Sequence, residues 1–475
     1  MYDLVVIGSG PAGEKAAALA AYFGKRVAMV ERNRRPGGAP VNTGGIPSKT
    51  LREAALYLND HRSRDVYGVG LALNSELALE RIRTRAAEVS TVVGGSVRRN
   101  LSRHGIELLI GEASLQPDRT VTLRQAGGRH QALKGEVVLI ATGSRPFHPP
   151  GIPFDDPDVH DSDTILDLDA SPKSLAVVGA GPVGCEYASI FASLGVKVSL
   201  IDTNLRILRH FDAEVSAGLE EAFVEIGMDL LLGWPKAQIA RRRGSVVVTA
   251  ASGEVVEPHK VLFAGGRVGN VKGLRLAESG VEVDERGRIV VDEHFRTTAE
   301  RVYAAGDVTG APLASISAEQ GRIAACHAFE VPFDLTLDWL PPSAVYTTPE
   351  VAMVGMTEEE AEEEEINYAV GRARFIDNPR SQLAATTRGF LKLLVRRDDR
   401  RLVGVHVVGE GAAELVHIGQ AAMHCDATID HFVQTTFNVP TRSEVYKYAA
   451  YDALQDLIGR RLPTATVPTA SMSHG

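Results

Sequence analysis

The feature that most constrains this fold is a glycine-rich turn placed between an apolar strand and a helix. Residues 2–31 read YDLVVIGSGPAGEKAAALAAYFGKRVAMVE, with Gly8, Gly10 and Gly13 in the turn and Glu31 at the end of the next strand. The glycines allow the backbone to approach a pyrophosphate at the helix N-terminus, where free N–H groups attract anions. A carboxylate after the second strand is placed to accept a hydrogen bond from a ribose hydroxyl. The segment therefore predicts a βαβ unit that binds a dinucleotide.

The same unit occurs a second time in the chain. Residues 174–202 read SLAVVGAGPVGCEYASIFASLGVKVSLID and contain Gly179, Gly181 and Gly184, and Asp202 follows the third glycine at the same distance as the acid of the first copy. Two such folds predict two dinucleotides, and the natural pair is FAD with a nicotinamide dinucleotide. The alternative is a duplicated fold of which one copy has lost its ligand.

Later strands complete both units. The run EVVLIATGSRP at 136–146 ends the first unit, and KVLFAGGRVGN at 260–270 ends the second in the same style. A third run, RVYAAGDVTG at 301–310, places Asp307 at a glycine-rich turn. An aspartate in a turn is most often simple turn chemistry. Here the preceding short strand and the position in the chain favour a binding role.

Composition argues against several other classes of protein. A net charge of −9 disfavours a nucleic-acid surface. No apolar run is long enough to cross a bilayer, and the strand pattern at the N-terminus leaves no room for a signal peptide. We therefore expect a soluble cytoplasmic protein that binds neither nucleic acid nor membrane. The cysteines, Cys185, Cys326 and Cys425, form no close pair, so we expect neither a disulfide framework nor a metal site.

Segment 37–49, GGAPVNTGGIPSK, closely resembles the redox-active segment of the flavoprotein disulfide reductases, which reads GGTCLNVGCIPSK. Further matches are the GxGxxGxE motif at 179–186, the ATG strand, the AAGD turn and a PTxSE motif at 440–444. These motifs span nearly the whole chain, which resembles the pyridine nucleotide–disulfide oxidoreductase family. The resemblance implies an α/β fold with two Rossmann-like dinucleotide-binding domains, one for FAD and one for NAD(P), and a C-terminal α+β dimerisation domain.

The domain plan follows from this resemblance and from the linkers. A chain of 475 residues is too long for one hydrophobic core, and proline-rich stretches lie at 145–157 and 340–350. In the third region the acidic run 357–366 is interpreted as a solvated helix face. The predicted domains are an FAD-binding domain in two parts, 1–150 and 268–339, an NAD(P)-binding domain, 151–267, and a dimerisation domain, 340–475, with a tail that is disordered from about 462.

The resemblance also assigns roles to individual residues. Lys49 and Glu186 are the catalytic candidates and would form an ion pair beside the flavin and the nicotinamide ring. A cation there stabilises the anionic reduced flavin, and the carboxylate keeps the cation oriented. The alternative is a surface lysine at a helix start and a glutamate on an amphipathic helix. The residues expected to bind FAD are Gly8, Gly10, Gly13, Glu31, Arg32, Gly38, Ser48, Thr142, Gly143 and Asp307, and those expected to bind the nicotinamide dinucleotide are Gly179, Gly181, Gly184, Asp202, Gly266 and Arg267.

Two parts of the family's disulfide chemistry are missing. The family has cysteines where this chain has Pro40 and Gly45, and a histidine where Val439 precedes the proline of PTxSE. A thiolate nucleophile requires sulfur, and valine cannot move a proton. Glu444 remains, but it has no imidazole to orient. Hydride transfer between a nicotinamide and a flavin needs neither missing part, and the family's soluble transhydrogenases also depart from these positions.

The leading hypothesis is therefore an FAD-dependent NAD(P) transhydrogenase that moves hydride from NADPH to N5 of FAD and on to NAD⁺. Asp202 favours NAD(H), because it would accept a hydrogen bond from the ribose 2′-hydroxyl. Arg206 and Arg209 either pair with the 2′-phosphate of NADP(H) or are solvated loop residues, and both interpretations stay open. The resemblance implies a homodimer or a higher oligomer of this chain.

Two other functions stay open at this point. Reduced flavin reacts with many acceptors, so an NAD(P)H dehydrogenase that uses a quinone or oxygen would need the same residues. A non-catalytic redox sensor would bind nucleotides and change partners. The retained Lys49 and Glu186 argue against the sensor, as does the lack of a visible interaction domain.

Overall fold

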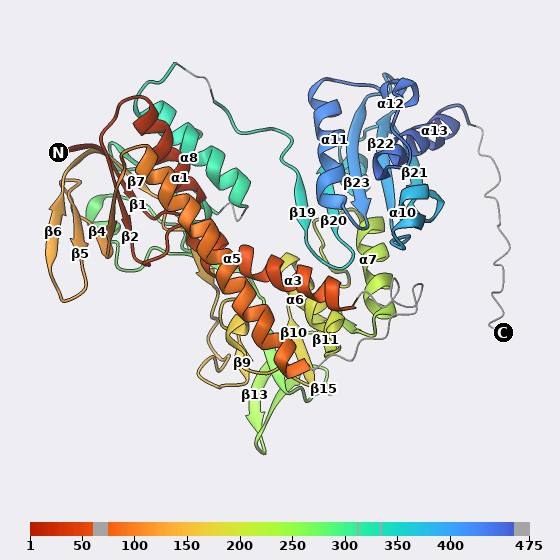
Figure 1. Ribbon diagram of the computed structural model, residues 1–475, viewed down its shortest axis with the longest axis horizontal. Coiled ribbons are helices and arrows are strands. Elements are labelled where there is room, and N and C mark those ends of the chain that lie inside the picture. The colour runs from red at the N-terminus through yellow and green to blue at the C-terminus, as the bar shows by residue number, and fades with distance from the viewer. Residues whose placement is uncertain (60–74, 311–312, 333–334, 460–475) are drawn as a thin grey trace. The chain divides into compact units, whose positions relative to one another are not determined.

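The computed structural model describes residues 1–59, 75–310, 313–332 and 335–459 (Figure 1). The chain divides into two compact units. The first unit consists of residues 1–208 and 223–339, and the second consists of residues 209–222 and the chain from 340 onward. The tail predicted to be disordered from 462 lies outside the described residues.

The first unit contains a five-stranded parallel sheet in the order β18-β7-β1-β2-β3. Neighbouring side chains of β1 point to opposite faces, and all of them are buried from Leu4 to Ile7. Helices α1 and α8 pack together over one face, and the antiparallel strands β4 to β6 cover the other (Figure 1). The bounds are β1 Tyr2–Ile7, β2 Val27–Glu31, β3 Glu107–Ile110, β4 Glu112–Leu115, β5 Val121–Arg124, β6 His130–Leu133, β7 Gly135–Ile140, β18 Val302–Ala304, α1 Pro11–Tyr22 and α8 Ala314–Ala328.

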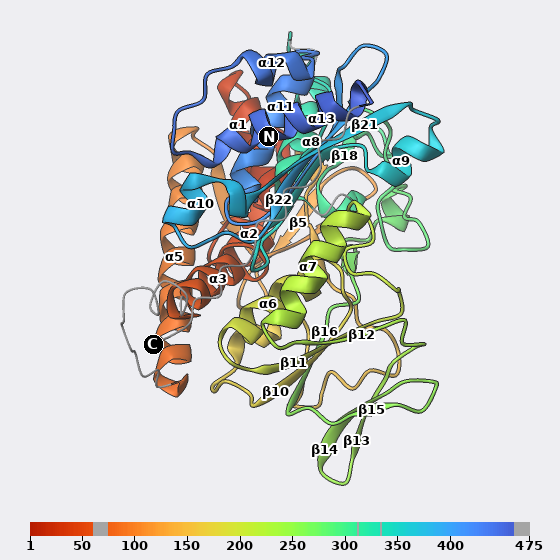
Figure 2. The ribbon, with the colours of Figure 1, turned by 90° about the vertical axis from the view of Figure 1, so that its right-hand side faces the viewer.

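A second parallel sheet of five strands, in the order β12-β11-β10-β16-β9, belongs to the same unit (Figure 2). The antiparallel strands β13 to β15 form a small separate sheet, and β8 pairs with β17 where the chain passes between the two dinucleotide folds. The bounds are β8 Ser144–Pro146, β9 Val159–His160, β10 Ser174–Val178, β11 Lys197–Asp202, β12 Asp229–Leu232, β13 Gln238–Arg242, β14 Ser245–Thr249, β15 Val255–Val256, β16 Lys260–Phe263, β17 Arg267–Gly269 and α6 Pro182–Ser193.

Helices of the first fold pack against a helix of the second fold and so place segment 37–49 next to it. Leu51 and Ala55 on α3 pack with Ile82 and Ala86 on α5 and with Ile190 on α6. This apolar contact places the start of α3 beside the start of α6, directly after the second glycine-rich turn. The bounds are α2 Gly38–Asn42, α3 Ile46–Asn59 and α5 Ser75–Arg103.

The second unit is an antiparallel sheet in the order β19-β20-β23-β22-β21, packed with helices over a continuous apolar core. Helix α13 lies so close against β21 that a β-carbon on Gly371 would come 2.0 Å from the carbonyl oxygen of Ala449. The bounds are β19 Ser343–Val345, β20 Val351–Gly355, β21 Tyr368–Arg374, β22 Phe390–Arg396, β23 Leu402–Val408, α9 Glu358–Glu363, α10 Pro379–Leu383, α11 Ala412–His424, α12 Ile429–Gln434 and α13 Val445–Leu457.

The predicted fold class is confirmed, with two parallel-sheet dinucleotide folds and a C-terminal α+β module. One helix differs from the simple plan. Helix α7, Ala213–Glu225, follows β11 in sequence, yet residues 209–222 pack with the second unit. No helix among the described residues is long and apolar enough to cross a membrane.

Candidate active site

The first glycine-rich turn has a geometry that only glycine fits. Gly8 has a φ of +106°, and a β-carbon there would lie 2.2 Å from the carbonyl oxygen of Ala141. A β-carbon on Gly13 would lie 2.0 Å from the carbonyl oxygen of Gly8. Helix α1 begins with Pro11, so its first backbone N–H groups face the turn with no side-chain cap. The turn therefore presents free donors beside close backbone contacts, as an anionic ligand requires.

The second turn repeats this geometry. Gly179 has a φ of +113°, and a β-carbon there would lie 2.6 Å from the carbonyl oxygen of Ala264. A β-carbon on Gly184 would lie 1.7 Å from the carbonyl oxygen of Gly179. A β-carbon on Gly181 would meet nothing within 4 Å, so the protein leaves this side of the turn open. Both predicted dinucleotide turns thus have the shape that the sequence pattern demands.

The two predicted ribose acids occupy matching places. Glu31 accepts hydrogen bonds from the backbone N and the Oγ of Ser9 at 3.0 and 2.6 Å. Asp202 accepts from the backbone N of Ala180 at 2.5 Å. In each fold the donor N–H therefore belongs to the residue after the first glycine. The acids tie the turns to the strand ends, and their contact with a ribose stays a prediction.

A buried polar group at the first turn fits a bound dinucleotide. Thr142 directly follows β7, which lies next to β1 in the sheet. The strand order reverses between these two strands, and folds of this kind bind their ligands at the carboxyl ends of the strands at such a point. Its Oγ1 is buried and has no hydrogen-bond partner among the described residues. Such an atom normally has a partner, which a bound ligand would supply. The residues of the first fold therefore fit FAD.

Asp307 and Arg267 meet at Ser144. The Oγ of Ser144 donates to Oδ2 of Asp307 at 2.6 Å, and Nε of Arg267 donates to the same Oγ at 2.8 Å. Arg267 also donates to the backbone carbonyl of Ser144 at 3.0 Å. The guanidinium thus supports the loop that orients Asp307. The contact of Arg267 with a nucleotide stays a prediction. The same holds for Gly143 and Gly266, which both have a positive φ and open space where a β-carbon would lie.

Lys49 and Glu186 are brought together. Nζ of Lys49 lies 2.6 Å from Oε2 of Glu186, and the glutamate side chain is only 9% exposed while the lysine side chain is 31% exposed. Lys49 lies in the first turn of α3 and Glu186 in α6. A half-exposed ammonium held by a buried carboxylate is well oriented for contact with a ligand. The alternative of two unrelated surface residues is therefore not supported by the geometry.

Other predicted residues of the first fold are placed as follows. Oγ of Ser48 turns back to the carbonyl oxygens of Gly44 and Gly45, at 3.2 and 3.1 Å. Gly38 approaches Gly10 so closely that a β-carbon on Gly38 would lie 2.7 Å from Cα of Gly10. Arg32 is exposed. The structure therefore explains Gly38 by backbone packing, and the binding roles of these residues stay predictions.

The positions that carry cysteines in the family lie in direct contact here. A β-carbon on Gly45 would lie 2.6 Å from the carbonyl oxygen of Pro40 and 2.8 Å from its Cα. Real β-carbons do not come this close to backbone atoms. The two positions are thus adjacent, as a disulfide would require, but position 45 has no room for a side chain while Pro40 stays in place.

Most of the remaining positions of interest lie in the second unit. Val439 is 58% exposed. Glu444 is buried, and its Oε1 accepts a hydrogen bond from Tyr448 at 3.2 Å. Arg206 is half-buried in the first unit and Arg209 is exposed in the second, so their pairing with a 2′-phosphate stays a prediction.

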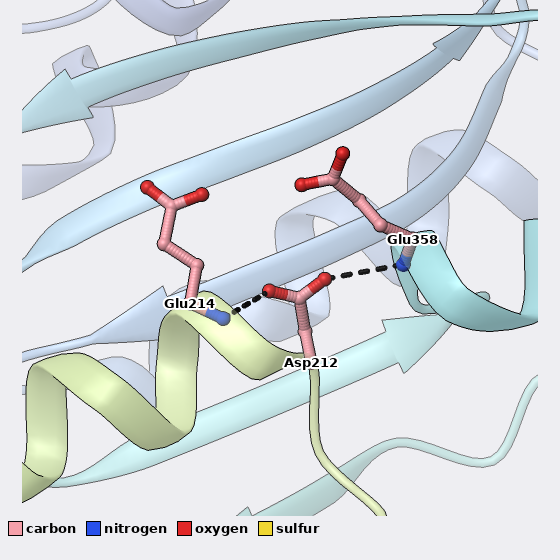
Figure 3. Close-up of side chains that lie close together, drawn as sticks. All are labelled: Asp212, Glu214 and Glu358. Carbon is pink, nitrogen blue, oxygen red and sulfur yellow. Dashed lines mark hydrogen bonds between the residues drawn. The ribbon is translucent and has the colours of Figure 1, made fainter.

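A carboxylate cluster in the second unit was not predicted from the sequence (Figure 3). Asp212 accepts hydrogen bonds from the backbone N–H groups of Glu214 and Glu358, at 3.0 and 3.1 Å. The ammonium of Lys392, whose side chain is 1% exposed, lies 2.7 Å from Asp212 and 3.2 Å from Glu214, and it also pairs with Glu358. Lys392 is thus a counter-ion of all three carboxylates, and Arg372 also pairs with Glu214 and Glu358. Glu358 belongs to the acidic run that was predicted to be solvated, and within that run only Glu360 and residues 362–365 are exposed.

The chain matches the family model "Pyridine nucleotide-disulphide oxidoreductase" over residues 2–328 and the model of the dimerisation domain of that family over residues 341–450. It therefore belongs to this family of FAD- and NAD(P)-binding flavoproteins. It is 42% identical over 458 residues to a soluble pyridine nucleotide transhydrogenase of Mycobacterium bovis, covering 96% of this chain and 98% of that one. It is 38% identical over 460 residues to a protein of the same name from Colwellia psychrerythraea, covering 96% and 98%.

Solved structures of similar fold include a protein named as a flavoprotein disulfide reductase. LpdA from Mycobacterium tuberculosis superimposes with a TM-score of 0.87 at 29% identity, covering 94% of this chain and 99% of that one. The HOCl-induced flavoprotein disulfide reductase RclA from Escherichia coli, as its Cu(II) complex, superimposes with a TM-score of 0.86 at 27% identity, covering 95% and 99%. Proteins of this fold thus include a disulfide reductase, and the residues of this chain must decide which reaction it performs.

Proposed function

We propose that this chain is a pyridine nucleotide transhydrogenase that uses FAD to move hydride between NADPH and NAD⁺. The observation that carries the proposal is the combination of a closely paired Lys49 and Glu186 with a segment 37–49 that holds no sulfur. Relatives that bear the transhydrogenase name match over nearly their whole length. We propose the predicted division into FAD-binding, NAD(P)-binding and dimerisation domains, with a homodimer as the working assembly.

When bound, FAD supplies a ring that accepts and returns a hydride. The first glycine-rich turn would hold its pyrophosphate, with Thr142 and Asp307 as further contacts. The second turn would hold the nicotinamide dinucleotide, and Asp202 would face its ribose. Lys49 would keep a positive charge at the reacting ring, and Glu186 holds that charge in one orientation by a 2.6 Å contact.

Three residues support the proposal that the chain is not a disulfide reductase. Pro40 and Gly45 supply no thiolate, and the contact between them leaves position 45 no space for one. Val439 cannot donate a proton to a leaving thiolate. The route that ends at a disulfide therefore lacks both its nucleophile and its acid, whereas the hydride route keeps every group that it needs.

The test is an anaerobic steady-state assay of the FAD-loaded protein with NADPH and one acceptor at a time. The acceptors are NAD⁺ or its thio analogue, a quinone, lipoamide and oxidised glutathione, with an aerobic sample added for oxygen. We expect rapid reduction of NAD⁺ and none of the disulfides. Turnover with quinone or oxygen but not with NAD⁺ would instead establish an NAD(P)H dehydrogenase. No turnover with any acceptor would favour a nucleotide-binding sensor.

A further inference from the structure

We propose that Asn204 is a specificity-determining residue that lets the second dinucleotide fold accept both NAD(H) and NADP(H). The inference deepens the proposed function and rests on it, because transhydrogenation through one flavin needs a nucleotide site that takes both cofactors in turn. Asp202 alone disfavours NADP(H), since its carboxylate would repel the 2′-phosphate. Asn204 follows two residues later, in the loop after β11.

The side chain of Asn204 covers one oxygen of Asp202. Its Nδ2 donates a hydrogen bond to Oδ1 of Asp202 at 2.7 Å, and its backbone N–H donates to the same oxygen at 2.8 Å. A carboxylate oxygen has two lone pairs, so the loop occupies Oδ1 fully. Among the described residues Oδ2 accepts only from the backbone N–H of Ala180, at 2.5 Å, and so keeps the capacity for one more donor.

The first dinucleotide fold offers an internal comparison at the same position. Oε1 of Glu31 accepts one hydrogen bond, from the backbone N–H of Asn33 at 2.8 Å, and Oε2 accepts two from Ser9. Asn33 also follows its acid by two residues, but its side chain is exposed. The additional donor of the first fold thus comes from the glycine-rich turn, whereas that of the second fold comes from the loop. The loop therefore leaves its oxygen of Glu31 open and covers that of Asp202.

The loop that carries Asn204 is held at three points. The carbonyl oxygen of Asn204 accepts from the backbone N–H of Gly233 at 2.9 Å, and that of Asp202 accepts from Trp234 at 3.0 Å. At the far end of the loop, the N–H of Leu208 donates at 3.0 Å to a carbonyl oxygen of the second glycine-rich turn. A fixed backbone therefore presents the amide to the acid before any nucleotide binds, which reduces the cost of ordering on binding.

This arrangement suits a ribose with or without a 2′-phosphate. For NAD(H), Oδ2 of Asp202 has the capacity to accept from a ribose hydroxyl. For NADP(H), the amide of Asn204 has a second N–H to give to a phosphate oxygen, because an amide nitrogen carries two and Asp202 takes one of them. The donors already on the carboxylate also offset its repulsion of the phosphate. Asn204 thus reduces the difference between the two affinities that Asp202 would impose.

The test measures the dissociation constants of NAD⁺ and NADP⁺ for the FAD-loaded protein by isothermal titration calorimetry. Oxidised nucleotides do not reduce oxidised flavin, so binding is measured without turnover. The variants are Asn204→Ala, Asp202→Asn and the two combined. Leu205→Ala is the control, because Leu205 is the next residue, is 85% exposed and has no polar side-chain atom to offer Asp202. Any contact of Leu205 with the adenine is shared by both nucleotides.

We expect the unmodified protein to bind the two nucleotides with dissociation constants within about tenfold of each other. Asn204→Ala should weaken NADP⁺ binding relative to NAD⁺ by about tenfold, because a donor to the phosphate is lost and Oδ1 of the acid is uncovered. In the Asp202→Asn background the same substitution should change the ratio by about threefold or less, because no charge is left to cover. Leu205→Ala should match the unmodified protein.

An equal loss for both nucleotides in Asn204→Ala, an unchanged ratio, or an effect just as large in the Asp202→Asn background would overturn the proposal. So would an unmodified protein that binds only one of the nucleotides. If Asn204→Ala folds poorly, Asn204→Asp decides the matter, because a second carboxylate should weaken NADP⁺ binding selectively. A protein that binds both nucleotides as expected but does not reduce NAD⁺ would refute the proposed function while supporting this role of Asn204.

Discussion

At the scale of single residues, the site is defined by one pair that is kept and one pair that is lost. Lys49 and Glu186 meet through a 2.6 Å contact across two folds. Pro40 and Gly45 stand where the sequence resemblance places the redox-active cysteines, and a β-carbon on Gly45 would lie 2.6 Å from the carbonyl oxygen of Pro40. Position 45 therefore has no room for a side chain while Pro40 is in place.

Replacing Lys49 by Met should lower kcat for hydride transfer by about a hundredfold, because a preorganised charge at the reacting ring is lost. FAD should stay bound, since Lys49 is not expected to hold its phosphates. Rapid-reaction traces of flavin bleaching by NADPH measure the effect. Lys197→Met is the control, because Lys197 is an exposed lysine of the same unit whose carboxylate partner lies 3.9 Å away. An unchanged rate in Lys49→Met would remove Lys49 from the mechanism.

Restoring cysteines should not restore a disulfide reductase. We expect Gly45→Ala to destabilise the protein by about 1–3 kcal/mol, because the added β-carbon is forced against Pro40. The double variant Pro40→Cys with Gly45→Cys should show no reduction of lipoamide or oxidised glutathione by NADPH. Denaturant unfolding measures the first effect, with Gly44→Ala as control, because a β-carbon on Gly44 would meet nothing within 4 Å. A fully active double variant would show that the acid at position 439 is dispensable.

At the scale of elements, helix α7 is held to the sheet of the second unit by buried charge. Its preceding residue Asp212 and its first-turn residue Glu214 pair with Lys392 on β22. Burial acts to raise the pKa of Asp212 and Glu214, but the nearby cations hold the pKa of both below its ordinary value. Burial acts to lower the pKa of Lys392, but the carboxylates hold it above its ordinary value.

Replacing Lys392 by Met should destabilise the protein by about 3–5 kcal/mol at neutral pH, because the buried Asp212 would lose its ion pair and Glu214 and Glu358 would be left with Arg372 alone. Groups with a lowered folded pKa add stability above their ordinary pKa values, 3.8 for Asp and 4.5 for Glu, and lose it as the pH falls through the lower folded values. The difference between the variant and the unmodified protein should therefore shrink below about pH 4. Thermal unfolding from pH 7 to pH 3 measures this, and a difference that stays constant would contradict the ion-pair account.

At the scale of the whole molecule, the family assignment implies a second copy of the chain. Large apolar side chains of the second unit are exposed in the single chain: Ile376, Leu383, Val439, Tyr448, Tyr451 and Ile458. Contiguous or numerous exposed apolar groups often mark an interface. We expect sedimentation equilibrium to give the mass of two chains of 50.9 kDa each. A monomer at micromolar concentration would contradict the proposed assembly.

The sequence predicted those parts of the site that depend on neighbouring residues. The glycine-rich turns were predictable because their pattern is local: Gly13 and Gly184 each approach the first glycine of their own turn, and Gly8 and Gly179 have a positive φ. The role of Lys392 was not predictable, because it depends on a contact between distant segments. In the sequence Lys392 is one residue of an ordinary strand, and only the fold brings it to Asp212, 180 positions away.

The most direct measurement is a double-mixing experiment on the FAD-loaded protein without oxygen. One equivalent of NADPH first bleaches the flavin, and the protein is then mixed with NAD⁺ while flavin absorbance and NADH are followed together. If the chain is a transhydrogenase, the flavin colour returns at a rate no slower than turnover, with one NADH formed for each flavin that recovers. A flavin that stays bleached in NAD⁺ and recovers only with quinone or oxygen would contradict transhydrogenation.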